Sequence, residues 1–196
     1  MKVGLYFGSF NPVHVGHLII ANHIAYHSNL DKVWLVVSPR NPFKDSEQLL
    51  NEYDRLHLVG LAVENEPRLH VSNIEFSLPR PSYTIDTLTY LQEKYPGTEF
   101  SIIMGSDGLQ NIEKWKNAEA ILNNYPILVY IRPGFEKLPG VNGNITVIEA
   151  PLLSISSTHI RQCIQNGKSI RYLVPDLVLE EIERCSFYHK KVNKIN

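Results

Sequence analysis

The stretch from Val3 to His17 constrains the fold of this chain more strongly than any other part of its sequence. It reads Val-Gly-Leu-Tyr-Phe-Gly-Ser-Phe-Asn-Pro-Val-His-Val-Gly-His. The apolar run 3–7 predicts a buried strand, which Gly8 and Ser9 interrupt before a helical pattern begins. A strand, a glycine turn and a helix start direct free backbone N–H groups and the positive end of the helix dipole at one point. The stretch therefore predicts an anion-binding site.

The helix after this turn has a clear predicted start. Asn11 is a good N-cap residue, and Pro12 suits the first helical position because it has no N–H group to leave unpaired. The helical pattern runs from Val13 to about His27. The residues expected to be buried are Val13, Leu18, Ile20, Ala21 and Ile24.

Two histidines stand at the predicted anion site. His14 and His17 are three residues apart, so they are neighbours in the first turn, and Gly16 leaves room for a ligand to approach the backbone. Imidazoles beside an anion site suit phosphate transfer, where catalysis is mostly positioning and charge stabilisation. A capped helix with two surface histidines is an equally simple interpretation of the local pattern.

The segment 8–17 resembles the GxFxPxHxGH signature of the nucleotidyltransferase superfamily that carries the HxGH motif. This resemblance implies transfer of an adenylyl or cytidylyl group from a nucleoside triphosphate. It also assigns residues of the segment to ATP: Gly8, Ser9, Phe10, His14 and His17.

Composition limits the remaining possibilities. The 196 residues, 43% apolar and 20% charged, suit one α/β domain, expected over 1–188 with a loose polar tail over 189–196. The formal net charge of −1 gives no general attraction to nucleic acid or to an anionic membrane. Cys163 and Cys185 fit no zinc or redox spacing. With no signal-peptide pattern and no apolar run of about 20 residues, we expect a cytoplasmic protein.

A proline-rich loop follows the second predicted strand. The apolar run 33–37 predicts a strand buried on both faces, and two prolines make 38–44 a loop at its carboxyl end. Arg40 and Lys44 would there face a phosphate, although a solvated basic loop fits the local pattern as well. The loop resembles the segment that covers the active site in the superfamily, which implies roles for Lys44 in catalysis and acceptor binding.

The middle of the chain continues to alternate between helix and strand. We expect a helix over 51–65 capped by Asn51 or Ser46, a short strand over 69–71 and 74–76, and a helix over 85–94 capped by Ser82 or Thr84.

Segment 78–88 resembles the RxGxSYTxDTL segment of the bacterial nicotinate-nucleotide adenylyltransferases, a branch of the same superfamily. The match is good from Ser82 onward, but Pro79 and Pro81 flank the arginine and the expected glycine is missing. The resemblance implies that Thr84 binds the nicotinate nucleotide.

A third loop follows the predicted strand 100–104. Asp107 there would accept hydrogen bonds from a ribose or orient a phosphate partner, or else cap the next helix. Trp115 would either pack in the core or stack on a flat ring. Gly105, Asp107 and Trp115 match the GxDxxxxxxxW arrangement of the same branch, with Ser106 where alanine is common. The match implies that Gly105 and Asp107 contact ATP and that Trp115 stacks on the pyridine ring.

The next elements are short. They are a helix over 118–122, a strand over 127–131, a loop over 134–143 and a last strand over 145–148. Arg132-Pro133-Gly134 resembles the family's RPG turn, and the resemblance assigns Arg132 to the acceptor nucleotide.

A second candidate anion site lies at 155–161. Ser156 or Ser157 is a natural N-cap, and Arg161, one turn later, could act as a planar phosphate clamp. A capped helix with a surface arginine is the alternative. The segment resembles the superfamily's second signature, ISSTxIR, which implies that Arg161 holds the leaving pyrophosphate. The ATP contacts implied here are Ile155, Ser157, Thr158 and Arg161.

Near the C-terminus, Gly167 should end this helix and Pro175-Asp176 should begin the final one. The final helix is expected to bury Val178, Leu179 and Ile182. His23 and His27 are four residues apart, but the sequence offers no third ligand, so no metal-binding residues are expected.

Together these patterns predict a Rossmann-like, doubly wound parallel sheet. The resemblance implies that ATP and nicotinate mononucleotide give deamido-NAD and pyrophosphate in NAD biosynthesis, with Mg²⁺ carried by ATP. It leaves room for a homo-oligomer. The alternatives are a sister adenylyltransferase acting on phosphopantetheine or nicotinamide mononucleotide, and a non-catalytic nucleotide-binding module.

Overall fold

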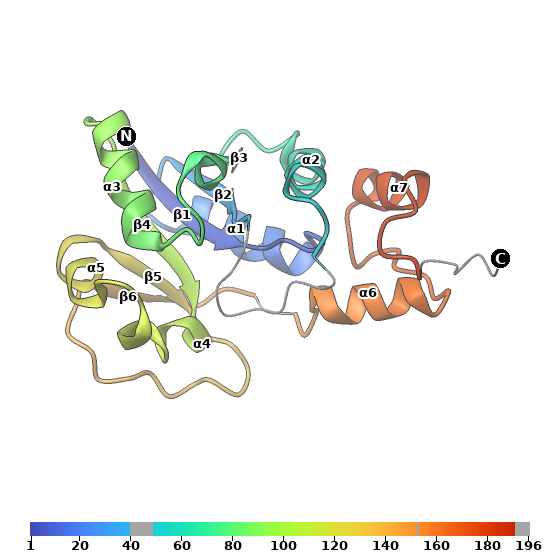
Figure 1. Ribbon diagram of the computed structural model, residues 1–196. Coiled ribbons are helices and arrows are strands. Elements are labelled where there is room, and N and C mark those ends of the chain that lie inside the picture. Colours follow the sequence, from blue (N-terminus) through green and yellow to red (C-terminus); the bar gives the residue numbers. More distant parts are fainter. Residues whose placement is uncertain (40–48, 152, 191–196) are drawn as a thin grey trace.

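The computed structural model describes residues 1–39, 49–151 and 153–190. Their strands form one parallel sheet in the order β3-β2-β1-β4-β5-β6, with β1 in the middle (Figure 1). The strands are β1 (Lys2–Gly8), β2 (Lys32–Val37), β3 (Leu69–Ser72), β4 (Glu99–Gly105), β5 (Ile127–Tyr130) and β6 (Ile145–Ile148).

The strand order reverses direction between β1 and β4, which both pair with neighbours in parallel register. In an open α/β sheet this switch point creates a crevice beyond the carboxyl ends of the strands, where ligands bind. The doubly wound, Rossmann-like fold expected from the sequence is therefore confirmed.

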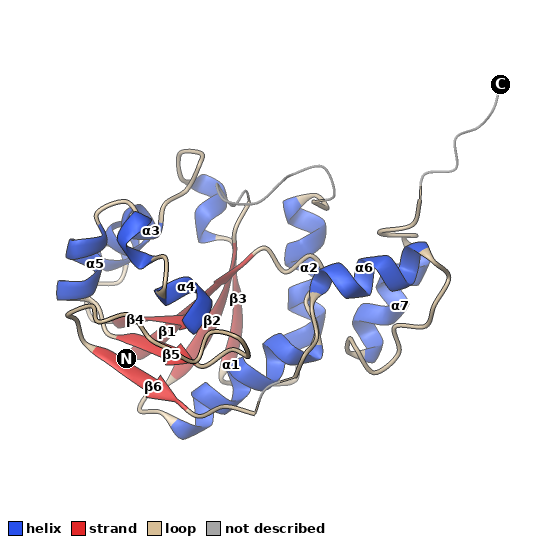
Figure 2. Cartoon of the chain, turned by 90° about the horizontal axis from the view of Figure 1, so that it is seen from below, coloured by secondary structure: helices blue, strands red, loops and turns tan. Residues whose placement is uncertain are grey.

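Helices cover both faces of the sheet (Figure 2). Helices α1 and α2 pack on one face, with α6 and α7 beyond them, and α3, α4 and α5 cover the other face. The bounds are α1 (Val15–His27), α2 (Glu52–Val63), η1 (Ile74–Ser77), α3 (Thr84–Lys94), α4 (Ser106–Leu109), η2 (Ile112–Lys114), α5 (Ala118–Asn124), α6 (Ser157–Gln165) and α7 (Asp176–Arg184).

Each face of the sheet has its own hydrophobic core. Ala21, Ile24 and Leu35 belong to the core under α1 and α2, whereas Leu5 and Ile102 belong to the core under α3 and α5. Successive side chains along a strand point alternately to these two cores, so side chains on both faces are buried. Strands β1, β2 and β4 are therefore almost continuously apolar.

Three local predictions are wrong. Helix α1 begins at Val15, because His14 has extended dihedral angles (φ −148°, ψ 168°) and is the N-cap, while the Asn11 Oδ1 accepts a hydrogen bond from Leu50 N at 3.1 Å. Residues 74–77 form the short 3₁₀ helix η1, not a strand. The N-cap of α3 is Tyr83, which makes no side-chain cap bond, while Thr84 is its first helical residue.

Several expected boundaries are confirmed. Asn51 caps α2 through its side chain, which accepts from Tyr53 N at 2.9 Å. Ser156 caps α6 by accepting from His159 N at 3.2 Å. Gly167 follows α6 with φ +64°, a conformation that favours glycine.

Other expectations fall outside the described residues. These are the positions of Arg40, Lys44 and Ser46 in the loop after β2, and most of the tail from 189. No helix in the described part of the chain is long and apolar enough to cross a membrane.

Candidate active site

A cleft of about 830 Å³ lies beyond the carboxyl ends of β1, β4 and β5. Every described residue that the sequence predicted for the site lines this cleft. They are Gly8, Ser9, Phe10, His14, His17, Thr84, Gly105, Asp107, Trp115, Arg132, Ile155, Ser157, Thr158 and Arg161. The remaining predicted residues, Arg40 and Lys44, lie outside the described residues.

The loop after β1 is held in an unusual conformation. Phe10 has φ +44°, a left-handed conformation that costs a non-glycine residue about 1–2 kcal/mol. Its buried ring lies over Gly8, where an added Cβ would stand 2.8 Å from the ring. Gly8 is therefore required for the loop to fold back on itself and turn its backbone into the cleft.

His14 and His17 lie stacked at the start of α1. Their ring centroids are 3.6 Å apart and their planes differ by 26°. The His14 backbone N–H donates to Nδ1 of His17 at 3.3 Å. Because Nδ1 of His17 accepts, a neutral His17 carries its proton on Nε2, which makes Nε2 a donor for a phosphate oxygen.

His14 is more deeply buried than His17, and only 5% of it is exposed. Burial, with a smaller contribution from the Arg132 guanidinium, lowers the pKa of His14 to about 4. The His14 ring turns back over the first turn of α1 and lies so close to Gly16 that an added Cβ there would be 3.1 Å from its Nδ1. Gly16 therefore makes space for this ring, and His14 is neutral near pH 7 in the free protein.

The start of α6 packs directly against the loop after β1. The Ser157 hydroxyl donates to the Pro12 carbonyl at 2.9 Å, and Arg161 Nη1 donates to the Asn11 carbonyl at 2.8 Å. Arg161 Nη2 is 3.4 Å from Thr158 Oγ1. The two segments predicted to bind anions therefore contact each other and line the same cleft, and Arg161 also braces the first loop.

Two tyrosines lie beneath this end of the cleft. The hydroxyls of Tyr6 on β1 and Tyr130 on β5 are 3.1 Å apart and buried. The Tyr6 ring also contacts the rings of Phe10 and His17 edge-on, at centroid distances of 5.9 and 6.2 Å. Burial raises the pKa of Tyr6 well above its ordinary value, so this pair is a neutral floor under the histidines.

Helix α4, which directly follows β4, contributes one half of an ion pair. Asp107 Oδ2 accepts from Arg132 Nη1 at 2.8 Å, and both side chains are partly exposed. An added Cβ on Gly105 would overlap Asp107 Oδ1 and lie 2.8 Å from Arg132 Cδ. Ser106, which replaces the common alanine, is fully buried and accepts from the Arg132 backbone N–H at 2.9 Å. The hydroxyl thus connects the ends of β4 and β5.

Thr84 and Trp115 line the opposite part of the cleft. Trp115 follows η2 and is half-buried. It packs against the core and also lines the cleft. This arrangement is compatible with the predicted stacking role and differs from that of a fully buried core tryptophan.

Sequence reasoning missed a buried carboxyl group in the wall of this cleft. Glu75 on η1 is 2% exposed and accepts hydrogen bonds from Ser82 and Thr87 hydroxyls, both at 3.0 Å. Burial raises the pKa of Glu75, although hydroxyl donors, among them Ser38, act in the opposite direction. Ser82, predicted as a helix cap, instead ties the loop before α3 to η1. Only the hydroxyl-rich segment 82–87 hinted at a buried acceptor.

A buried arginine, Arg55, was also missed. It lies in a helix that the sequence predicted as densely apolar, and the one lysine or arginine of that helix was the available signal. Arg55 borders the loop after β1 through a hydrogen bond to Ser9 O at 2.6 Å.

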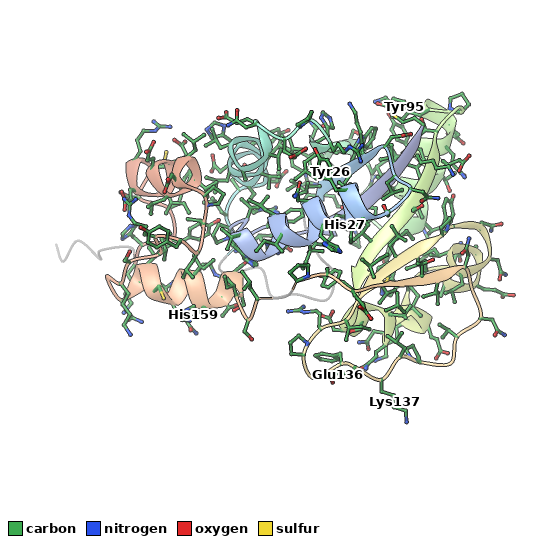
Figure 3. The ribbon with its side chains drawn as sticks, turned by 180° about the vertical axis from the view of Figure 1, so that it is seen from behind. Tyr26, His27, Tyr95, Glu136, Lys137 and His159 are labelled. Carbon is green, nitrogen blue, oxygen red and sulfur yellow. The ribbon has the colours of Figure 1, made fainter. Side chains whose placement is uncertain are left out.

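The remaining histidines contribute nothing to the cleft. His23 and His27 stack at 4.0 Å on α1, and His159 is exposed on α6 (Figure 3). Within the described ranges, no three His, Cys, Asp or Glu side chains are grouped so that they could hold a metal ion.

Comparison with known proteins gives consistent matches over most of the chain. The profile of the family described as cytidylyltransferase-like matches residues 5–163. A protein of Flavobacterium psychrophilum, named "Probable nicotinate-nucleotide adenylyltransferase", is 53% identical and covers 97% of this chain and 100% of the relative. A protein of Cytophaga hutchinsonii with the same name is 51% identical and covers 96% of this chain and 98% of the relative.

A solved structure has the same fold. The nicotinic acid mononucleotide adenylyltransferase of Plasmodium falciparum complexed with NaAD has a TM-score of 0.81 and 21% identity, over 95% of this chain and 97% of that chain. At this identity the likeness concerns the fold alone.

Proposed function

We propose, from the premise that this chain belongs to the cytidylyltransferase-like family and within it to the nicotinate-nucleotide adenylyltransferases, that it adenylylates nicotinate mononucleotide. ATP and nicotinate mononucleotide would give deamido-NAD and pyrophosphate, a step of NAD biosynthesis. The observation that carries the proposal is the contact between α6 and the first loop, which brings the starts of α1 and α6 to one cleft.

The reaction needs no protein nucleophile. A phosphate oxygen of nicotinate mononucleotide attacks the α-phosphorus of ATP, and the bond from that phosphorus to the bridging oxygen of the β-phosphate breaks. The electron pair leaves with pyrophosphate. Because the acceptor brings its own oxyanion, the protein has to align two anions and stabilise the charge that develops.

The histidines and α6 would act on the phosphates. His17 would donate from Nε2 to an α-phosphate oxygen, while the neutral His14 stacks against it and fixes its ring. Arg161, with Ser157 and Thr158 at the start of α6, would hold the leaving pyrophosphate. Preformed donors of this kind are more effective in the transition state than donors that must first reorganise.

The other end of the cleft would bind the acceptor. Trp115 would stack on the pyridine ring, and Thr84 and Arg132 would bind its polar groups. Asp107 would bind on the adenosine side, next to Arg132. Ser9 would contact the acceptor phosphate, and Lys44 is assigned to it by the resemblance of its loop alone.

The residues of the cleft also fit Mg²⁺ brought in by the nucleotide. Of the described carboxylates in its lining, Asp107 is paired with Arg132 and Glu75 with two hydroxyls. Mg²⁺ commonly binds through substrate phosphates and water with one or two carboxylates at most, so Asp107 is the residue that would approach it. When bound, the ion would neutralise charge on the phosphate oxygens.

We place the reaction in the cytoplasm. The free thiols of Cys163 and Cys185 suit a reducing compartment, and the substrates are soluble nucleotides. With a formal net charge of −1, the chain has no overall basic character for a nucleic-acid partner.

The test is pyrophosphate release from ATP and Mg²⁺ with nicotinate mononucleotide, nicotinamide mononucleotide or phosphopantetheine as acceptor. Release with nicotinate mononucleotide well above the other two supports the proposal. Release with phosphopantetheine alone would overturn the acceptor and the roles of Thr84 and Trp115. No release with any acceptor, together with ATP binding, would favour a binding module.

A further inference from the structure

Arg55 is a charged side chain that helix α2 buries completely, with an exposed fraction of 0%. Among the described residues, its guanidinium donates four hydrogen bonds, each to a backbone carbonyl group. Nε donates to Leu50 O at 2.9 Å, Nη1 to Ser9 O at 2.6 Å and Ser38 O at 2.8 Å, and Nη2 to Pro39 O at 3.0 Å. A buried cation is costly unless its donors are satisfied, and here neutral carbonyl groups accept from four of the five N–H groups.

The four carbonyls lie on segments that are distant in sequence but adjacent in space. Ser9 follows β1, Ser38 and Pro39 follow β2, and Leu50 precedes α2. Strands β1 and β2 are neighbours, with Gly8 opposite Val37. Arg55 therefore ties the carboxyl ends of two neighbouring strands to one helix, directly behind the cleft.

This bonding pattern fixes the direction of one peptide group at the site. In a trans peptide the C=O and N–H groups point in opposite directions, so holding Ser9 O toward Arg55 turns the Phe10 N–H away from α2. Both Ser9 and Phe10 line the cleft. Phe10 has the left-handed conformation, which surrounding contacts must maintain.

We propose that Arg55 is a positioning residue for nucleotide binding, which holds the Ser9–Phe10 peptide so that its N–H faces the triphosphate. It does not touch substrate itself. The inference rests on the proposed function, because it assigns the triphosphate to the loop after β1. Lysine cannot replace the residue, because one ammonium group cannot reach carbonyls that the planar guanidinium contacts on several sides.

The experiment compares Arg55→Ala and Arg55→Lys with a matched control, Arg68→Ala. Arg68 also donates to a backbone carbonyl, Ala25 O at 2.7 Å, and lies over the Tyr26 ring, but it is not part of the cleft lining. Each variant is tested for folding by circular dichroism and thermal unfolding, for pyrophosphate release, and for affinity toward a methylene analogue of ATP.

We expect kcat/KM to fall about 100-fold in Arg55→Ala, as for a misplacement of about 1 Å, and affinity for the analogue to fall with it. Added methylguanidinium should restore part of the activity of Arg55→Ala, whereas an equal volume of buffer should restore none. Arg68→Ala should lose stability but keep kcat/KM close to wild type. A folded Arg55→Ala or Arg55→Lys with wild-type kcat/KM would overturn the proposal.

Two outcomes remain to be separated. If Arg55→Ala does not fold, Arg55→Lys decides, because a folded lysine variant must still lose kcat/KM. If the wild type binds the analogue but releases no pyrophosphate with nicotinate mononucleotide, the proposed function fails. Arg55 is then judged on analogue affinity, and an unchanged affinity in a folded variant overturns its role.

Discussion

The two ends of the cleft are built differently. At the end that we propose for the phosphates, Phe10 and His14 are almost fully buried, and Arg55 and Arg161 hold the backbone carbonyls of their loop. At the other end, where we propose that the acceptor binds beside the adenosine side, Trp115 is half-buried, and Arg132 forms a partly exposed ion pair with Asp107. Glu136 and Lys137 continue this end into an exposed loop (Figure 3).

The difference separates two tasks. Stabilising charge in phosphate transfer demands donors that are already in place, and buried hydrogen bonds to backbone provide that rigidity. Recognising a heteroaromatic ring depends on contact area, which partly exposed side chains supply while they adjust. Substitutions of the histidines should therefore change mainly kcat, whereas substitutions of the residues proposed to bind the acceptor should change KM for one substrate.

The largest expected effect is that of His17→Ala. Removing one donor from a preorganised anion site costs about 10²–10³-fold in kcat. Substrate binding should change little, because other groups on both helix starts still contact the phosphates. Steady-state kinetics for both substrates measures this, and an unchanged kcat would remove His17 from the mechanism.

His14 should make the free protein sensitive to acid. Its pKa is lowered to about 4 in the folded state, below the unfolded value of about 6.5, so the unfolded state binds more protons between these values. The free energy of unfolding should fall as pH drops through this window, by up to about 3 kcal/mol. Denaturant titrations between pH 7 and pH 4 measure the loss.

The matched variant for that titration is His14→Gln, which keeps a polar side chain but has no proton to bind. Its free energy of unfolding should change less between pH 7 and pH 4 than that of the wild type. Parallel curves for the two proteins would contradict the role given to burial of His14.

Trp115→Ala should have a smaller and selective effect. Loss of stacking on a ring costs about 1–3 kcal/mol, so KM for the pyridine nucleotide should rise about tenfold while KM for ATP stays close to wild type. Trp115→Phe, which retains a flat ring, should recover much of the difference. Equal rises in both KM values would identify Trp115 as a structural residue.

The smallest effect is expected on stability at the Asp107–Arg132 pair. An exposed ion pair contributes about 0–1 kcal/mol, so Arg132→Ala should unfold almost as the wild type does. Arg171→Ala breaks an exposed pair with Asp176, outside the lining of the cleft, and is the control. Only Arg132→Ala should raise KM for nicotinate mononucleotide, and a rise in both variants would argue against specific binding.

The order of strands and helices could be predicted because the buried parallel strands are continuous apolar runs. Prediction failed where a side chain bonds to a distant segment instead of a near one. Asn11 accepts from Leu50 and Ser82 donates to Glu75, so neither caps the helix that follows it. Local pattern cannot show which of two possible partners a polar side chain will choose.

The described residues predicted for the site line one cleft, but the contacts among them were only partly predictable. Each signature segment is continuous in the chain, so its residue types can be recognised from the sequence alone. The contact of Arg161 with Asn11 and the burial of Arg55 depend on how α6 and α2 pack against the first loop. Packing between elements that are far apart in the sequence produces no periodic pattern of residues from which it could be predicted.

The bond between Arg161 and Asn11 joins residues 150 positions apart, and that between Ser157 and Pro12 joins residues 145 apart. During translation, the strand and loop that hold the histidines emerge from the ribosome first. They remain without α6, the second helix that we propose to bind phosphate, until it has left the exit tunnel. An unfinished chain therefore holds half of an adenylylation site, and competence for the reaction is among the last properties that synthesis confers.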